Sequence, residues 1–289
     1  MSTKAKVIFV NSFKGGAGKT TLALTHCIDN LFHETNYENT VYIDLDVLGT
    51  GTAYLFGEGV LPETSSFDKE EAPVEVPLEL NKVKASLYMA YLDPAMKIRS
   101  VYGNSYFVNH QGIAEEAQKE RVLNLIRSQI KQEQNTLFVI DCAPGFSKLE
   151  QSILTECYEM MLKKKLEVEE EYVTTLDSAH IQKFIQCLND SADGFSTPAA
   201  YRSIRLIIND MQNYTEYVAQ HSTKNADLYW DKVIEKIQKE LRHKAVTIVR
   251  WKFSREIATQ STFLEEVAVE NHLDDYIFTD DNYKILYQP

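Results

Sequence analysis

Short apolar runs alternate along the chain with longer segments in which apolar residues recur every three or four positions. Such runs are typical of buried strands, and such segments are typical of helices packed on a sheet. We predict strands at 7–11, 41–45, 105–108, 137–140, 172–174, 204–208 and 246–249, and helices at 20–32, 115–131, 149–164, 178–188, 228–242 and 262–269. Repeated βαβ units of this kind indicate an α/β fold, a doubly wound and mainly parallel sheet with helices on both faces.

The length of 289 residues, 44% of them hydrophobic, allows one large domain or two small ones. We favour a single domain over residues 1–289. Residues 58–81 break its rhythm with three prolines and seven acidic residues against one lysine, so we predict an acidic loop insertion there. A solvated loop and a partner-binding segment are both open readings. The lysines at 163–165 and the glutamates at 167–171 are interpreted as an exposed helix end and loop.

Composition narrows the class of protein further. The four cysteines form no C-x-x-C pair, which disfavours a zinc site or a disulfide framework. No apolar run reaches 18 residues, so we expect a soluble, cytoplasmic protein that does not enter a membrane. The formal net charge of −12 argues against a surface built throughout for nucleic acid, although it leaves room for a local basic patch.

The segment 14–20, which reads Lys-Gly-Gly-Ala-Gly-Lys-Thr, carries the strongest chemical signal. Its glycines allow successive backbone N–H groups to turn toward an anion, and its second lysine can reach the terminal phosphates of a nucleotide. The segment lies between a predicted strand and a predicted helix, the context that a phosphate-binding loop requires. A glycine-rich turn without nucleotide is the alternative. The predicted nucleotide-binding residues are Gly15, Gly16, Ala17, Gly18, Lys19, Thr20 and Thr21.

Phe13 stands where the general phosphate-loop pattern has glycine, and a second lysine, Lys14, follows it. This combination resembles the deviant Walker A motif of the ParA/MinD family of ATPases. The strand at 41–46, with Asp44 and Asp46 at its end, is similar to the family's second motif, although the usual proline and glutamine after it are missing. An aspartate at a strand end can also be a simple cap or turn residue.

Two later segments extend the resemblance. Residues 137–145 resemble the Walker B strand, with Asp141 at its end, and the switch loop after it. Residues 206–210 look like the strand whose terminal asparagine, here Asn209, reads adenine in this family. An ordinary turn asparagine is the alternative at that position.

The resemblance implies ATP and Mg²⁺ as cofactors. Lys19 and the loop amides would hold the phosphates, while Thr20 and Asp141, supported by Asp44, would hold the metal ion. Asp46 would orient the attacking water. Lys14 would reach the partner subunit's phosphates in an ATP-dependent homodimer, unless it is simply a solvated lysine.

The implied function is that of a dimerising switch ATPase, closer to ParA than to MinD, which partitions or positions a plasmid, another DNA or a protein cargo. The candidate DNA or partner surfaces are Lys97 with Arg99, Lys148, Arg202 with Arg205, and the basic segments 242–244 and 250–255. The end of the chain is short and acidic rather than a basic amphipathic helix, which argues against membrane binding. The alternatives are an ATP-gated regulatory adaptor that controls a partner without binding DNA and a small-molecule kinase.

Overall fold

The computed structural model describes residues 5–32, 36–46, 73–80, 82–90, 104–132, 134–145, 147–163, 165–191, 202–209, 220–221, 226–242 and 246–251. The strands are β1 Ala5–Asn11, β2 Asn39–Asp44, β3 Val74–Leu80, β4 Val83–Ala90, β5 Thr136–Asp141, β6 Glu167–Thr175, β7 Ser203–Asn209 and β8 Val246–Trp251. The helices discussed below are α1 Lys19–Phe32, α3 Asn104–Lys131, α4 Lys148–Leu162, α5 Ser178–Ser191 and α7 Ala226–Glu240.

The eight strands form one sheet in the order β3-β4-β2-β5-β1-β6-β7-β8. Every neighbouring pair is parallel except β3 and β4, which are antiparallel at one edge. The predicted α/β class with a mainly parallel sheet is therefore confirmed. Because β1 lies between β5 and β6, its carboxyl end is flanked on both sides by the carboxyl ends of parallel strands. In open α/β sheets this edge is where ligands bind.

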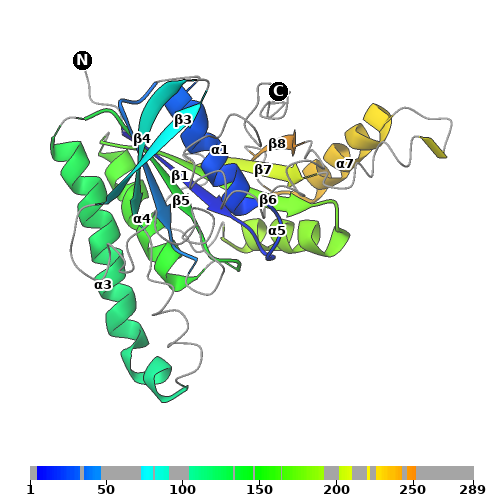
Figure 1. Ribbon diagram of the computed structural model, residues 1–289. Coiled ribbons are helices and arrows are strands. Elements are labelled where there is room, and N and C mark those ends of the chain that lie inside the picture. Colours follow the sequence, from blue (N-terminus) through cyan, green and yellow to red (C-terminus); the bar gives the residue numbers. More distant parts are fainter. Residues whose placement is uncertain are drawn as a thin grey trace.

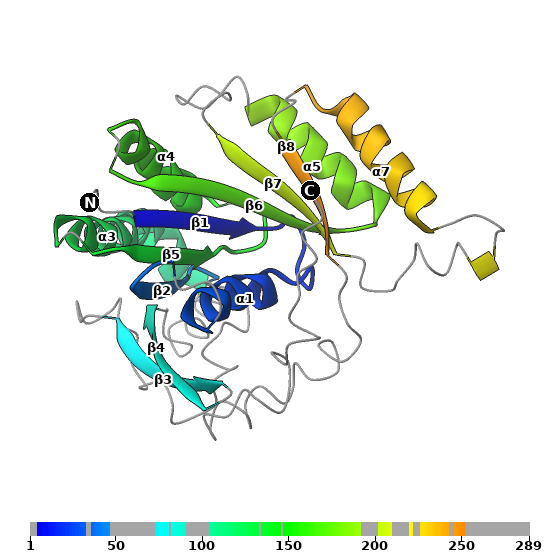
Figure 2. The ribbon, with the colours of Figure 1, turned by 90° about the horizontal axis from the view of Figure 1, so that it is seen from above.

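Helices cover both faces of the sheet (Figures 1 and 2). On one face, α1 packs through residues such as Leu22 and Cys27 against Val10 and Tyr42. On the other face, α3 and α4 pack against Phe9 and Phe138, and α5 and α7 pack against β6 and β7. Alternate residues of β1 thus enter opposite cores, as the two-residue period of a strand requires. The central strands are buried on both sides, which explains their continuous apolar runs.

The fold differs from the sequence-based expectation in three elements, α3, β3 and β4. Residues 105–108, predicted as a strand, belong to the long helix α3. Residues 74–80, predicted as part of an acidic loop, form the edge strand β3, and β4 was not predicted at all. Alternation of acidic and apolar residues in β3 is the period-two pattern of an edge strand, which tolerates Pro77. The predicted helix at 262–269 lies outside the described residues.

The interpretation of residues 167–171 as an exposed loop is wrong. They begin β6, a strand in the interior of the sheet, and Glu169, Glu170 and Glu171 are all buried. Each carboxylate has a cationic partner from another element. Glu169 pairs with Lys6 on β1 at 2.5 Å, and Glu170 pairs with Arg202, just before β7, at 2.7 Å. A buried charge is tolerated only with such compensation.

Candidate functional site

The phosphate-loop segment 12–18 connects the end of β1 to the start of α1, the position predicted from the sequence. Gly16 and Gly18 have φ angles of 74° and 101°, in the left-handed region that favours glycine. A Cβ atom on Gly18 would lie 2.9 Å from Asn209 Nδ2 and 3.0 Å from Trp251 Cζ3. Gly18 is therefore required both for its backbone conformation and for the close approach of two buried side chains.

The first turn of α1 brings Lys19 and Thr20 to the end of β5. Thr20 Oγ1 donates a hydrogen bond to Asp141 Oδ2 at 2.6 Å, and Lys19 is buried with 6% of its surface exposed. The N-terminal end of a helix presents unpaired N–H groups and a partial positive charge. The loop, Lys19 and this helix end together form a site suited to an anion such as a phosphate group.

Asp44 and Asp141 end the adjacent strands β2 and β5 and are partners in the strand register. Tyr42 Oη donates a second hydrogen bond to Asp141 Oδ2 at 2.9 Å. Burial and the neighbouring charge of Asp44 raise the pKa of Asp141 to about 7, although Lys19 and the two hydroxyl donors act in the opposite direction. Two buried carboxylates side by side repel each other when both are ionised, and a bound cation would stabilise their charged forms.

The residues present fit a magnesium ion bound together with a nucleotide. Asp141 Oδ1 is buried and has no hydrogen-bond partner among the described residues. The Thr20 hydroxyl donates to the other oxygen of the same carboxylate, Oδ2. Mg²⁺ prefers oxygen ligands and usually keeps several waters, so it needs few protein ligands beyond the phosphates. The described residues hold no cluster of three or more His, Cys, Asp or Glu side chains that could hold a metal ion.

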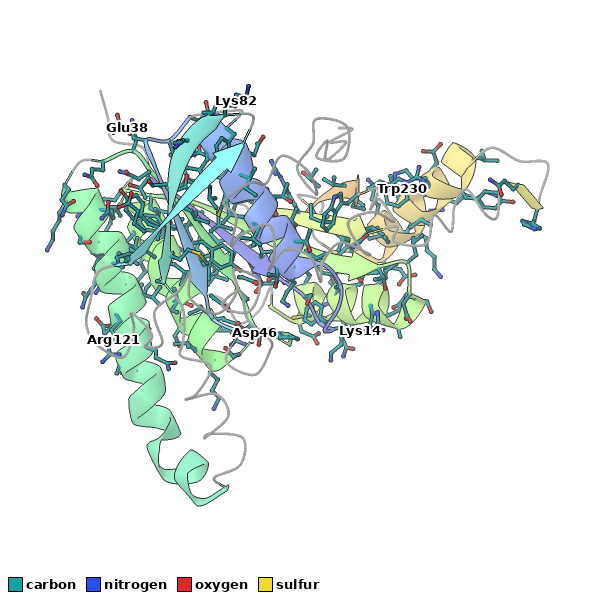
Figure 3. All side chains as sticks on the ribbon, in the orientation of Figure 1. Lys14, Glu38, Asp46, Lys82, Arg121 and Trp230 are labelled. Atoms are coloured by element: carbon teal, nitrogen blue, oxygen red, sulfur yellow. The ribbon has the colours of Figure 1, made fainter. Side chains whose placement is uncertain are left out.

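Asp46 follows β2 by two residues and is half-buried. Its backbone N–H donates to Asp44 Oδ1 at 2.9 Å, which fixes the turn after the strand. Asp46 therefore leaves the sheet at the same edge as the phosphate loop, and Figure 3 shows both Asp46 and Lys14 at this end of the molecule.

Lys14 is exposed at the tip of the loop. Its charge contributes to lowering the pKa of Asp177, after the main cause, a hydrogen bond from the N–H of Ala179. Lys14 thus lies within electrostatic reach of the start of α5. Its ammonium group is available to a ligand or to another chain, in contrast to the buried Lys19.

Comparison with known proteins decides the fold. No protein-family model matches the sequence, and no curated protein matches it. Among solved structures, a ParA family ATPase from Chlorobium tepidum is 14% identical, with a TM-score of 0.57 and coverage of 93% of this chain and 92% of that chain. The chain has the fold of the ParA and MinD ATPases. The resemblance inferred from the motifs is confirmed at this level.

Two further structures with the ParA/MinD fold are similar to this chain. The MinC:MinD cell division complex of Aquifex aeolicus is 13% identical, with a TM-score of 0.53 and coverage of 92% and 89% of the two chains. A variant of McdA from Cyanothece in complex with ATP is 14% identical, with a TM-score of 0.52 and coverage of 98% and 94%. Identities this low establish the architecture alone.

Within this ParA/MinD fold, Asn209 ends β7 and makes a contact with the phosphate loop that the sequence alone did not indicate. Its Nδ2 donates to the carbonyl of Ala17 at 2.9 Å, and its Oδ1 is buried without a partner among the described residues. Asn209 therefore ties the end of β7 to the phosphate loop. Its role in reading adenine stays a prediction. Ala17 is buried under this contact, and Thr21 accepts the hydroxyl of Thr25 through its carbonyl at 2.7 Å.

Two of the arginines proposed for a DNA surface are used inside the ParA/MinD fold. Arg202 is buried and donates to both oxygens of Glu170, and Arg205 pairs with Glu169 at 2.5 Å. Trp230 lies on α7 (Figure 3), and Arg250 lies 5.5 Å over its ring. Lys148 is exposed at the start of α4. The candidates Lys97 and Arg99, residues 243–244 of the first basic segment and residues 252–255 of the second lie outside the described part of the chain.

Sequence reasoning missed three residues of the site: Tyr42, Glu150 and Trp251. Tyr42 looks like an ordinary strand residue, and its contact with Asp141 depends on the pairing of β2 with β5. Trp251 reaches Gly18 only because β8 pairs with β7. Glu150 did have a local signal, since Ser147 three residues earlier makes a capping-box pattern.

No helix among the described residues is long and apolar enough to cross a membrane.

Proposed function

We infer that this protein is an ATP-dependent switch ATPase of the ParA type, which hydrolyses ATP to ADP and phosphate and alternates between a monomer and an ATP-bound dimer. The observation that carries this proposal is the contact between the helix turn that follows the glycine loop and Asp141, whose register partner on the neighbouring strand is Asp44. The hydroxyl of Thr20 contacts Asp141 at 2.6 Å, directly beside a loop in which Gly16 and Gly18 have positive φ angles. The fold shared with ParA and MinD ATPases supports it.

In this proposal Lys19 and the amides of residues 15–18 bind the phosphates, and Thr20 and Asp141, with Asp44 nearby, hold Mg²⁺. The metal ion, when bound, neutralises charge on the phosphate oxygens. Asp46 accepts a hydrogen bond from the attacking water and orients it toward the γ-phosphate. Hydrolysis of ATP depends mainly on positioning and on cations around the phosphate, so one further positive charge has a large effect.

Lys14 is the proposed source of that charge, supplied to the nucleotide of a second copy of this chain. An exposed lysine in a glycine loop can leave its own site and meet a partner. This arrangement makes hydrolysis conditional on dimerisation, which is what a switch requires. In the proposed cycle the ATP-bound dimer binds its DNA or protein cargo, and hydrolysis releases it.

A test compares wild type with Lys14→Ala, using size-exclusion chromatography with light scattering in ATP, ADP or no nucleotide, together with ATP binding and hydrolysis. Wild type should dimerise only with ATP. Lys14→Ala should bind ATP with similar affinity because Lys19 and the loop amides remain, but it should neither dimerise nor hydrolyse ATP. Lys19→Ala should lose binding itself. Lys236→Ala, an exposed lysine on α7, is the matched control.

The proposal fails if wild type stays monomeric at micromolar concentration with ATP and Lys14→Ala hydrolyses ATP normally. The same result would point to a P-loop protein of another kind.

One observation favours the second candidate function, an ATP-gated regulatory adaptor that controls another protein without binding DNA. Two arginines of the candidate DNA surface are held in pairs with buried glutamates. The net charge of the chain is −12, and DNA affinity depends on free cationic side chains. Binding of the ATP-bound protein to a random duplex at two salt concentrations separates the candidates, since a DNA-binding ParA should bind more weakly at the higher salt.

A further inference from the structure

Glu150 forms hydrogen bonds with Ala143 and Ser147 in the loop between β5 and α4, near the candidate site. It lies in the first turn of α4 and has no exposed surface. One carboxylate oxygen accepts the N–H of Ala143 in a short hydrogen bond, and the other accepts the N–H of Ser147 at 2.5 Å. The bond to Ser147 belongs to the capping box of α4. The bond to Ala143 does not, because that residue lies four positions before the cap.

The loop between these two bonds touches the phosphate loop. Gly145, at its middle, donates its N–H to the carbonyl of Ser12 at 2.9 Å. The hydroxyl of Ser12 in turn donates to the carbonyl of Lys14 at 2.8 Å. The Glu150 carboxylate is therefore connected to the main chain of Lys14 by these hydrogen bonds together with the short stretches of backbone between them.

We propose that Glu150 is a positioning residue, whose carboxylate fixes the loop after β5 and, through Gly145 and Ser12, the main chain that carries Lys14. The inference rests on the proposed function, since it makes the Lys14 charge depend on the order of this loop. Main-chain placement matters here because a displacement of about 1 Å of a charged group can cost roughly 100-fold in rate. Its effect on hydrolysis passes through the loop, because the hydrogen bonds of its carboxylate go to the backbone N–H groups of Ala143 and Ser147.

Capping alone does not account for this arrangement. A capping box needs the bonds between Ser147 and Glu150 only, and both are present, with Ser147 Oγ accepting the Glu150 N–H at 3.3 Å. The further bond to Ala143 links the residues that follow β5 to the first turn of α4. It also satisfies a backbone donor next to Cys142, whose own N–H bonds to Val10 on β1 at 3.1 Å. The backbone N–H groups of Ala143, Gly145 and Ser147 are thus all held by hydrogen bonds.

The experiment compares Glu150→Gln with two matched variants of α4. Ser147→Ala removes the cap bond to the Glu150 N–H but leaves both bonds that the carboxylate accepts. Glu156→Gln makes the same substitution at a partly exposed glutamate that pairs with Arg127 at 3.4 Å. Glu150→Asp keeps the charge on a shorter side chain that cannot span both donors, and it serves if the Gln variant does not fold.

Two measurements are made on each purified full-length variant. Hydrogen exchange without nucleotide reports the amides of Ala143, Gly145 and Ser147. Binding and hydrolysis of ATP report the site. We expect Glu150→Gln, and Glu150→Asp to a smaller degree, to speed exchange at Gly145, to keep ATP affinity within a few-fold, and to lower hydrolysis by roughly 10- to 100-fold. Ser147→Ala and Glu156→Gln should leave Gly145 exchange and hydrolysis close to wild type.

Unchanged exchange at Gly145 in both Glu150 variants would overturn the proposal. So would equal losses of hydrolysis in Ser147→Ala and Glu150→Gln, because the helix cap would then explain the effect. If wild type itself neither hydrolyses ATP nor dimerises, the proposed function fails. The exchange comparison would still decide whether Glu150 holds the loop against Ser12.

Discussion

At the scale of single residues, the charge on Glu150 controls part of the stability of the fold. Burial raises the pKa of Glu150 to about 7 from the usual 4.5, against the opposing effect of its hydrogen bonds to Ser147 and Ala143, and the negative charge of Asp46 adds to the rise. A raised pKa means that the folded state binds a proton more tightly than the unfolded state. Stability from this group is thus present below about pH 4.5 and is lost as the pH rises through about 7.

We predict that Glu150→Gln removes this pH dependence. As the pH rises from below 4.5 to above 7, the unfolding free energy of wild type should fall by about 3 kcal/mol relative to that of the variant. Urea denaturation without nucleotide or Mg²⁺, at several pH values, measures it. The unfolding free energy of Glu156→Gln should change with pH in the same way as that of wild type. A constant difference between wild type and Glu150→Gln would contradict the prediction.

The candidate site could be predicted from sequence where function demands a local pattern, and not where it depends on pairing of strands. Gly16, Gly18, Lys19 and Thr20 are adjacent in the sequence, so the loop was found directly. Asp141 was found because it ends an apolar strand. Tyr42 and Trp251 reach the site only through the register of β2 with β5 and of β8 with β7, which the sequence does not specify locally.

At the scale of elements, β6 carries an unusual feature, a buried carboxylate with four donors. Glu170 accepts two hydrogen bonds of 2.7 Å from Arg202 and one of 2.8 Å from Tyr172. It also accepts a short bond from the Tyr158 hydroxyl on α4. The carboxylate thus joins β6 to α4 and to the start of β7, and a loss of Arg202 would leave its charge buried.

We predict that Arg202→Met destabilises the fold by about 3–5 kcal/mol, the range for breaking a buried ion pair by removing one partner. The double variant with Glu170→Met should recover part of this loss, because it buries no uncompensated charge but takes away the acceptor of the Tyr158 and Tyr172 hydroxyls. Arg127→Met serves as the control, since its pairs with Glu120 and Glu156 are partly exposed and should contribute less than about 1 kcal/mol.

Denaturant unfolding of the four proteins measures these differences. If the single variant and the double variant lost equal stability, the carboxylate would not need its arginine.

The same strand explains why part of the fold could not be predicted from sequence. A run of glutamates is usually exposed, and the cations that allow its burial come from positions 6, 202 and 205, all far from the glutamates in the sequence. The segment 105–108 was predicted as a strand because its short apolar run fits a strand as well as a buried helix. Its neighbours extend it into a helix of 28 residues. The strongly apolar strands β1, β2, β5 and β7 were all found.

At the scale of the whole molecule, Lys14 and Asp46 lie at the same edge of the sheet and have different proposed roles. Lys14 is exposed on the phosphate loop, whereas Asp46 is half-buried after β2, with its backbone fixed to Asp44. In the proposed function the first residue assembles the dimer and the second limits its lifetime. The two roles predict opposite effects on oligomeric state when either side chain is removed.

We predict that Asp46→Ala binds ATP and Mg²⁺ normally and accumulates as a stable dimer, because nothing orients the attacking water and the γ-phosphate persists. Loss of one oriented group typically costs about 10² to 10³ in rate, or roughly 3 to 4 kcal/mol, enough to turn a transient dimer into a long-lived one. Light scattering over time after addition of ATP measures the dimer lifetime. Asp190→Ala, at an exposed aspartate on α5, should dissociate as wild type does. A monomeric Asp46→Ala that still binds ATP would show that this carboxylate supports assembly instead, since the fault would then precede hydrolysis.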